Sequence, residues 1–201
     1  MSGTSGNAFE GIALLERLPF AWLAADLADT TQLDNANHET ARALQALAVY
    51  EDTPREPVGD GGHHGNPELL NLQAKVDVLL SLVGRLIADQ AGQPPRHSMI
   101  LRAQGIEWYG PGQVGVGPGE TGYAMIYANP VLPLPLRLPG RVVGSVERGG
   151  IRWLQTRFEY LTPAVAGGLE KMLFRRHRRQ IAFSKGTDVF TETGIFKASK
   201  Y

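Results

Sequence analysis

The feature that most constrains the fold of this chain is a long apolar repeat near its middle. Apolar residues recur there at alternating steps of three and four, which is the heptad spacing of helices that pack lengthwise against one another. The repeat positions are Leu69, Leu72, Val76, Leu79, Val83 and Leu86. The pattern predicts a helix over residues 67–91, begun by a cap at Asn66 and by Pro67. We expect this helix to assemble with sister copies, and packing on its own domain is the alternative.

Two segments of different character precede this helix. Residues 8–50 carry apolar residues at helical spacing, interrupted by Pro19, and predict an N-terminal helical segment in which Asn37 caps the second helix. Residues 53–66 are rich in proline and glycine, and they predict a flexible linker. The linker therefore separates the heptad helix from the N-terminal segment.

After the heptad helix the apolar pattern changes from a helical period to a period of two. Short alternating stretches between glycine turns predict five or six antiparallel strands, which suggests a small barrel. A helix then begins with Thr162 as its cap and Pro163 as its first residue. We expect residues 92–182 to form this barrel with its C-terminal helix, followed by a tail of residues 183–201 without a strong pattern.

Composition and motifs exclude several classes of function. The chain has no cysteine, so it contains no disulfide, catalytic thiol or zinc–cysteine site. No apolar run approaches the roughly 18 residues that span a membrane, and the N-terminus lacks a signal pattern, so we expect a cytoplasmic protein. No phosphate loop or nucleophile elbow is present, and the histidines are scattered. We therefore predict no catalytic residue, no metal site and no enzyme.

Charge is unevenly distributed along the chain, although the net charge is zero. Residues 1–66 hold ten acidic and three basic residues, whereas residues 67–201 hold ten acidic and seventeen basic residues. The densest charge is the basic cluster, which consists of Arg175, Arg176, Arg178 and Arg179. Two interpretations of this basic cluster are open. It binds a nucleic acid or a membrane surface, or it forms ion pairs with the acidic N-terminal segment. The absence of an aromatic platform argues against nucleic acid, so we favour pairing within the protein.

The ordered combination of these elements resembles the PilZ domain of bacterial cyclic di-GMP signalling. A short barrel followed by a helix with the sequence LEKMLFRRHRRQIA is similar to a PilZ domain. The stretches LLNLQAKVDVLLSLVGRLI and FEGIALLERLPFAW resemble the atypical, tetramer-forming branch of the family. The resemblance, from about residue 8 to residue 182, implies a homotetramer with an α+β fold. In that fold, a six-stranded antiparallel PilZ β-barrel with a C-terminal helix follows a heptad helix and an N-terminal helical segment.

Ordinary PilZ domains hold cyclic di-GMP with two motifs, Arg-x-x-x-Arg before the barrel and Asp/Asn-x-Ser-x-x-Gly on the first strands. Here Gly105 matches the final glycine, which we expect to be kept for the backbone freedom of a strand-to-strand corner. Arg102 stands where the serine belongs, and Ile100 stands where the acid or amide belongs. Ile100 also replaces the second arginine that would follow Arg96. The residues that remain candidates for a ligand are Arg96, Arg102 and Gly105.

The broken motifs predict a regulatory module that lacks the usual nucleotide site. The resemblance implies cyclic di-GMP-linked control of motility, pili or virulence through contacts with other signalling proteins, and we expect no cofactor. Two alternatives stay open. One is a cyclic di-GMP receptor that uses an unconventional arginine site, and the other is a nucleic-acid or membrane binder that uses the basic cluster.

Overall fold

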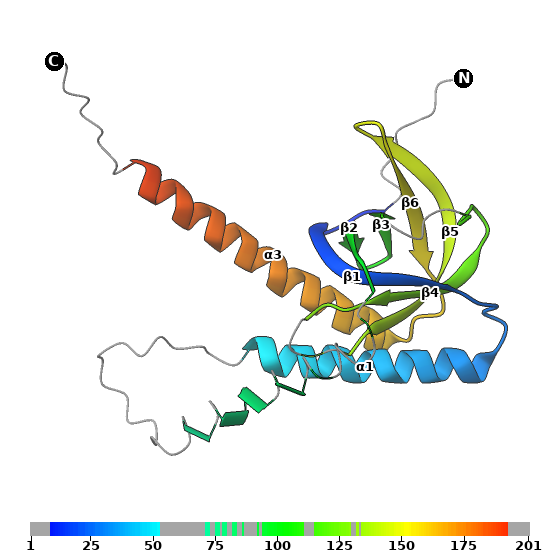
Figure 1. Ribbon diagram of the computed structural model, residues 1–201, viewed down its shortest axis with the longest axis horizontal. Helices are drawn as coiled ribbons and strands as arrows, with labels where there is room; N and C mark the ends of the chain where they lie inside the picture. Colours follow the sequence, from blue (N-terminus) through cyan, green and yellow to red (C-terminus); the bar gives the residue numbers. More distant parts are fainter. Residues whose placement is uncertain are drawn as a thin grey trace.

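Six stretches of the described chain form antiparallel strands, which close into a barrel (Figure 1). The strands are β1 (Leu14–Ala24), β2 (Arg96–Arg102), β3 (Gly105–Tyr109), β4 (Thr121–Ile126), β5 (Leu136–Arg148) and β6 (Ile151–Phe158). Their order around the barrel is β1-β2-β3-β6-β5-β4, and every neighbouring pair is antiparallel. The predicted six-stranded antiparallel barrel is therefore confirmed.

The computed structural model describes most, but not all, of the chain. The described residues are 9–52, 71–72, 75–76, 78–79, 82–83, 86, 92, 94–110, 115–129, 132 and 134–192, with side chains for all of these except 52 and 183–192. The predicted linker of residues 53–66 lies outside them.

The strand β1 closes the barrel, and it replaces the helix predicted for this part of residues 8–50. Its first half pairs with β2 and its second half with β4. Pro19, which is poorly tolerated inside a helix, pairs with Arg96 where the partner strand changes. Leu14 and Phe20 are fully buried in the core. The leucine spacing suits a helix locally, but two strand partners and a buried face stabilise a strand, so the helical prediction is wrong for β1.

The N-terminal helix α1 (Thr30–Asp52) begins after a different cap from the one predicted. Two backbone amides of its first turn donate to Asp29 Oδ1 at 3.0 and 3.1 Å. Asn37 lies buried in the middle of the helix, so its predicted capping role is wrong. Its side chain instead donates to the carbonyl of Tyr160 at 2.9 Å and accepts from the amide of Thr162 at 3.0 Å. These bonds tie α1 to the turn that follows the barrel.

The C-terminal helix α3 (Pro163–Glu192) begins as predicted, because Pro163 is its first residue and the Val165 amide donates to Thr162 Oγ1 at 3.5 Å. It runs through Glu192, so part of the predicted tail is helical. α1 packs against β5 and α3, and apolar residues of both helices extend the barrel core (Figure 1). No helix in the described part of the chain combines the length and the apolar character needed to cross a membrane.

Aromatic rings fill part of the barrel core and support the strands that carry the candidate site. The Trp108 ring lies 4.8 Å from the Phe20 ring and 5.7 Å from the His97 ring, measured between centroids. Trp108 Nε1 donates to Thr156 Oγ1 at 3.2 Å, which satisfies the polar group of a buried indole. The ring contacts therefore join β3 to β1 and β2, and the hydrogen bond joins β3 to β6.

The heptad positions that the structure describes are helical and exposed in the single chain. The exposed fractions are 61% for Leu72, 45% for Val76, 60% for Leu79, 51% for Val83 and 57% for Leu86. Leu69 lies outside the described residues. Aliphatic side chains exposed to this extent at a heptad spacing are typical of a helix face that other chains cover.

Candidate functional site

The predicted ligand residues Arg102 and Gly105 lie at the two ends of the β2–β3 turn, paired across the hairpin. The Arg102 side chain is 6% exposed, and its Nη1 lies 3.5 Å from Glu107 Oε1. The Glu107 side chain is fully buried. The guanidinium of Arg102 therefore lies beside a buried carboxylate of its own chain. Arg102 is therefore engaged within the barrel wall.

Glu107 in β3 binds two further groups besides Arg102. Arg148, the last residue of β5, donates from Nη2 to Glu107 Oε2 at 2.6 Å. Gln155 of β6 donates from Nε2 to Glu107 Oε1 at 3.4 Å. Four strands thus contribute to one carboxylate and its partners. Sequence reasoning missed Glu107 and Arg148. The acidic residue inside the apolar strand GIEWY could have indicated Glu107, because a carboxylate that a strand buries needs cationic or hydrogen-bonding partners.

Gly105 is required by close packing and not by an unusual backbone angle. A Cβ at this position would lie 2.5 Å from the carbonyl oxygen of Thr156 and 2.6 Å from the ring of Phe9. Gly105 is not among the glycines with positive φ, so the prediction that it supplies backbone freedom is wrong. Gly105 therefore lies in close contact with β6 and with the ring of Phe9.

Arg96 lies at the opposite end of β2 from Arg102. Six residue steps along an extended strand separate their Cα atoms, which corresponds to about 20 Å at ~3.3 Å per step. Arg96 is exposed, and its Nη1 donates to the carbonyl of Arg17 at 3.2 Å. The structure therefore does not bring the two candidate arginines into one site.

A groove of about 370 Å³ lies beside the β2–β3 turn, between the residues that precede β1 and α3. The charged residues that line it are Glu10 and Glu170. Both of these side chains are carboxylates, which repel phosphate groups. In the described part of the chain, no three His, Asp or Glu side chains lie together as metal ligands would.

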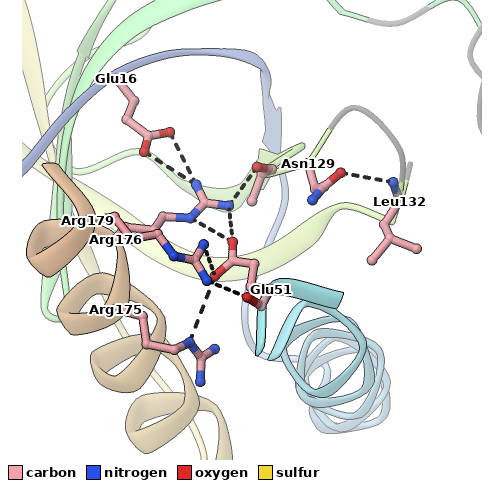
Figure 2. Close-up of polar contacts among 8 residues, drawn as sticks. Glu16, Glu51, Asn129, Leu132, Arg175, Arg176 and Arg179 are labelled. Atoms are coloured by element: carbon pink, nitrogen blue, oxygen red, sulfur yellow. Dashed lines mark hydrogen bonds and ion pairs between the residues drawn. The ribbon is translucent and has the colours of Figure 1, made fainter. Parts of the chain in front are cut away.

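Arg176 in α3 is the centre of an ion-pair network that joins three elements of the fold (Figure 2). Its Nε and Nη2 donate to Glu51 Oε1 at 3.1 and 2.9 Å, and its Nη1 donates to Glu16 Oε2 at 3.2 Å. Its Nη2 also donates to the carbonyl of Ala128 at 2.8 Å. Glu16 belongs to β1 and Glu51 to the end of α1, so the network ties β1, α1 and α3 together.

Two other members of the basic cluster also approach Glu51. Arg175 Nε lies 3.8 Å and Arg179 Nη1 lies 3.6 Å from Glu51 Oε2, and Arg179 also donates to the Glu51 carbonyl. The Arg178 guanidinium instead lies 5.8 Å from the centre of the Phe174 ring. The expected pairing of the basic cluster with the acidic N-terminal segment is confirmed for Arg175, Arg176 and Arg179.

The Glu16 carboxyl titrates differently in the folded protein and in the unfolded chain. Burial raises its pKa above the ordinary value of 4.5, the charge and hydrogen bond of Arg176 lower it, and the charge of Glu51 raises it again, with a net increase. The folded protein therefore holds this proton more tightly than the unfolded chain does. The stability that follows from this difference is complete below about pH 4.5 and is lost as the pH rises through the folded-state pKa.

Replacing Glu16 by glutamine should remove this loss of stability. We expect the free energy of unfolding of Glu16→Gln to increase relative to that of the unaltered chain as the pH rises from about 4 to about 7, because glutamine buries no charge. Urea unfolding at a series of pH values measures the difference. Leu15→Ala, at the exposed neighbouring position, is the control and should give a profile parallel to that of the unaltered chain. A difference that falls with rising pH would contradict the prediction.

Comparison with known protein families finds a match over most of the chain. A family model described as "Atypical PilZ domain, cyclic di-GMP receptor" matches residues 44–186. The chain belongs to the atypical PilZ family. The resemblance inferred from the sequence is therefore confirmed. The matched part of this PilZ chain begins within α1 and leaves out β1, yet β1 pairs with both β2 and β4 to close the barrel.

A solved structure from Xanthomonas campestris is similar to this PilZ chain. It is 28% identical in sequence with a TM-score of 0.65, and the alignment covers 85% of this chain and 91% of the other. That protein is described as a pathogenic protein with a new tetrameric PilZ domain, self-assembled via an unusual helical bundle. No curated protein matches the chain.

Proposed function

We propose that this PilZ chain is a non-enzymatic, cytoplasmic regulatory module that assembles as a homotetramer and lacks the usual cyclic di-GMP site. It acts in cyclic di-GMP-linked control of motility, pili or virulence through contacts with other signalling proteins. The observation that carries the proposal is the pairing of Arg102 with the buried carboxylate of Glu107. An arginine engaged in this way has to leave its partner before it contacts a nucleotide phosphate, and that separation is costly in a buried position.

The exposed heptad positions support the assembly. The described members are 45–61% exposed in the single chain. Each aliphatic side chain that sister copies bury completely contributes roughly 1.5–3 kcal/mol relative to full exposure. The similar Xanthomonas structure is described as a tetramer self-assembled via a helical bundle, which supports four copies here.

A cyclic di-GMP receptor with an unconventional arginine site is the second candidate. The description of the family model as a cyclic di-GMP receptor favours it. Arg96, which is exposed at the start of β2, would then be a contact for the nucleotide. Binding of nucleic acid or a membrane through the basic cluster is less favoured, because Arg175, Arg176 and Arg179 lie close to acidic side chains of the same chain.

Calorimetric titration with cyclic di-GMP distinguishes the first two candidates. For the unaltered chain, at a mass established by light scattering, we expect no saturable binding at micromolar nucleotide concentrations. Arg96→Ala and Arg102→Ala test the two candidate arginines, and Arg42→Ala, at an exposed arginine of α1, is the matched control. Saturable binding that Arg96→Ala or Arg102→Ala abolishes and Arg42→Ala preserves would establish the receptor instead.

A further inference from the structure

The surroundings of Glu107 are those of a bound oxyanion. Arg102 Nη1 lies 3.5 Å from one carboxylate oxygen, Arg148 Nη2 lies 2.6 Å from the other, and Gln155 Nε2 donates to the first oxygen at 3.4 Å. Two guanidiniums and an amide that converge on one anion are the donors that proteins use for phosphate and carboxylate ligands. In this barrel the anion is a side chain of the protein itself.

The position of Arg148 connects this site to the solvent. Its side chain is 41% exposed, whereas the side chains of Arg102 and Glu107 are 6% and 0% exposed. Arg148 is the last residue of β5, immediately before the turn of Gly149 and Gly150. Two guanidinium groups, one of them partly exposed, therefore face one buried carboxylate group at this site.

We propose that Arg102 and Arg148 form an oxyanion-binding pair whose ligand is supplied by the chain itself as the Glu107 carboxylate. The external ligand class that matches the pair is a phosphate group, whether free or part of a nucleotide. This inference rests on the proposed function and deepens it. The usual nucleotide motifs are broken at Ile100 and Arg102, and in addition an internal carboxylate occupies the guanidinium of Arg102.

The effective concentration of the Glu107 carboxylate at the two arginines is higher than the concentration that a dissolved phosphate reaches. A group on the same chain binds in an intramolecular step, with an effective concentration that is high because the β3 strand holds it in place. Phosphate therefore does not compete in the unaltered chain. Removal of the carboxylate should leave two guanidiniums without their anion, in a space that opens toward Arg148.

The variant Glu107→Ser tests this inference, because serine removes the carboxylate and leaves space for an external anion. The probe is inorganic phosphate, compared with sodium chloride at the same ionic strength. We expect the Tm of Glu107→Ser to rise saturably in phosphate, by about 3–6 °C at a tenfold excess over Kd. The Tm of the unaltered chain should be the same in both salts. A second titration with cyclic di-GMP shows whether the opened site accepts phosphate as part of a nucleotide.

Two double variants show whether the rise of Tm in phosphate depends on the pair of Arg102 and Arg148. Addition of Arg148→Met to Glu107→Ser should abolish the phosphate effect. Addition of Arg141→Met should leave it intact, because Arg141 pairs with Glu159 at 3.2 Å in a separate ion pair of β5. A response that persists equally in Glu107→Ser with Arg148→Met would overturn the inference.

If Glu107→Ser is poorly folded, its folding in phosphate and in chloride tests the inference. Folding that is recovered in phosphate but not in chloride supports the inference. If the variant is unfolded in both salts, Glu107→Asn decides, because it removes the charge, carries a polar amide and is one methylene shorter, which leaves space for the anion. A smaller phosphate-specific rise in its Tm supports the inference, and no rise overturns it. Binding of cyclic di-GMP by the unaltered chain would instead overturn the proposed function, whereas a folded Glu107→Ser without a phosphate response overturns this inference alone.

Discussion

Aspartate at both Val76 and Leu79 is expected to convert the assembled protein into folded single chains. These positions are 45% and 60% exposed in the single chain, so the barrel does not depend on them. In an assembly the same positions would bury carboxylates against apolar neighbours, at a cost far above the roughly 1.5–3 kcal/mol that each aliphatic side chain contributes. Light scattering should report a fall in mass from about four chains of 21.8 kDa to one.

The matched control for this experiment is Asn71→Asp. Asn71 is an exposed helical residue between the heptad positions, so the same charge placed there should leave the assembled mass unchanged. Circular dichroism of both variants should show the helix and strand content of the unaltered chain. The prediction is wrong if the unaltered chain already has the mass of a single chain at micromolar concentration, or if the double variant keeps the assembled mass.

The replacement Arg176→Met is expected to cost about 3 kcal/mol or more in the free energy of unfolding. The Arg176 side chain is 12% exposed and binds Glu16, Glu51 and the carbonyl of Ala128. Removing one partner from a buried ion pair leaves a charge without compensation, which typically costs 3–5 kcal/mol. Arg175 and Arg179 also approach Glu51, so we expect the lower end of that range. Urea unfolding monitored by tryptophan fluorescence measures the loss.

Two further variants test whether the loss of stability in Arg176→Met comes from its ion pairs. The exposed neighbour Arg178 lies near the Phe174 ring without an ion pair to Glu51 or Glu16, so Arg178→Met should cost at most about 1 kcal/mol. The double variant Arg176→Met, Glu16→Gln removes the carboxylate that Arg176 leaves behind in β1 and keeps Glu51 beside Arg175 and Arg179, so it should regain part of the loss. If Arg176→Met costs no more than Arg178→Met, the network does not stabilise the fold.

Local sequence patterns predicted an element correctly where residues within that element decide its structure. The alternation of apolar residues after residue 92 predicted strands, and it is confirmed by β2 to β6. Thr162 and Pro163 predicted the start of α3, because a cap and a first-turn proline act within one turn of helix. The order of these elements was also sufficient to recognise the PilZ family.

The same patterns failed where a partner distant in the sequence decides the outcome. β1 has leucines at helical spacing, but strands from two other parts of the chain pair with it. Asn37 has the chemistry of a cap, yet it bonds to the turn at Tyr160 and Thr162, more than a hundred residues away. Local propensity is worth tenths of a kcal/mol per residue, so two ladders of hydrogen bonds and a buried face outweigh it.

The sequence by itself determined the family, the strands β2 to β6 with the helix that follows them, the heptad spacing and the loss of both nucleotide motifs, because each depends on residue type and on spacing along the chain. Tertiary structure alone decided what the charged residues do. Glu107 meets Arg148 across 41 residues, and Arg176 meets Glu16 across 160. The physical reason is that the effect of a charge depends on its burial and its partner, and only the closed barrel sets both.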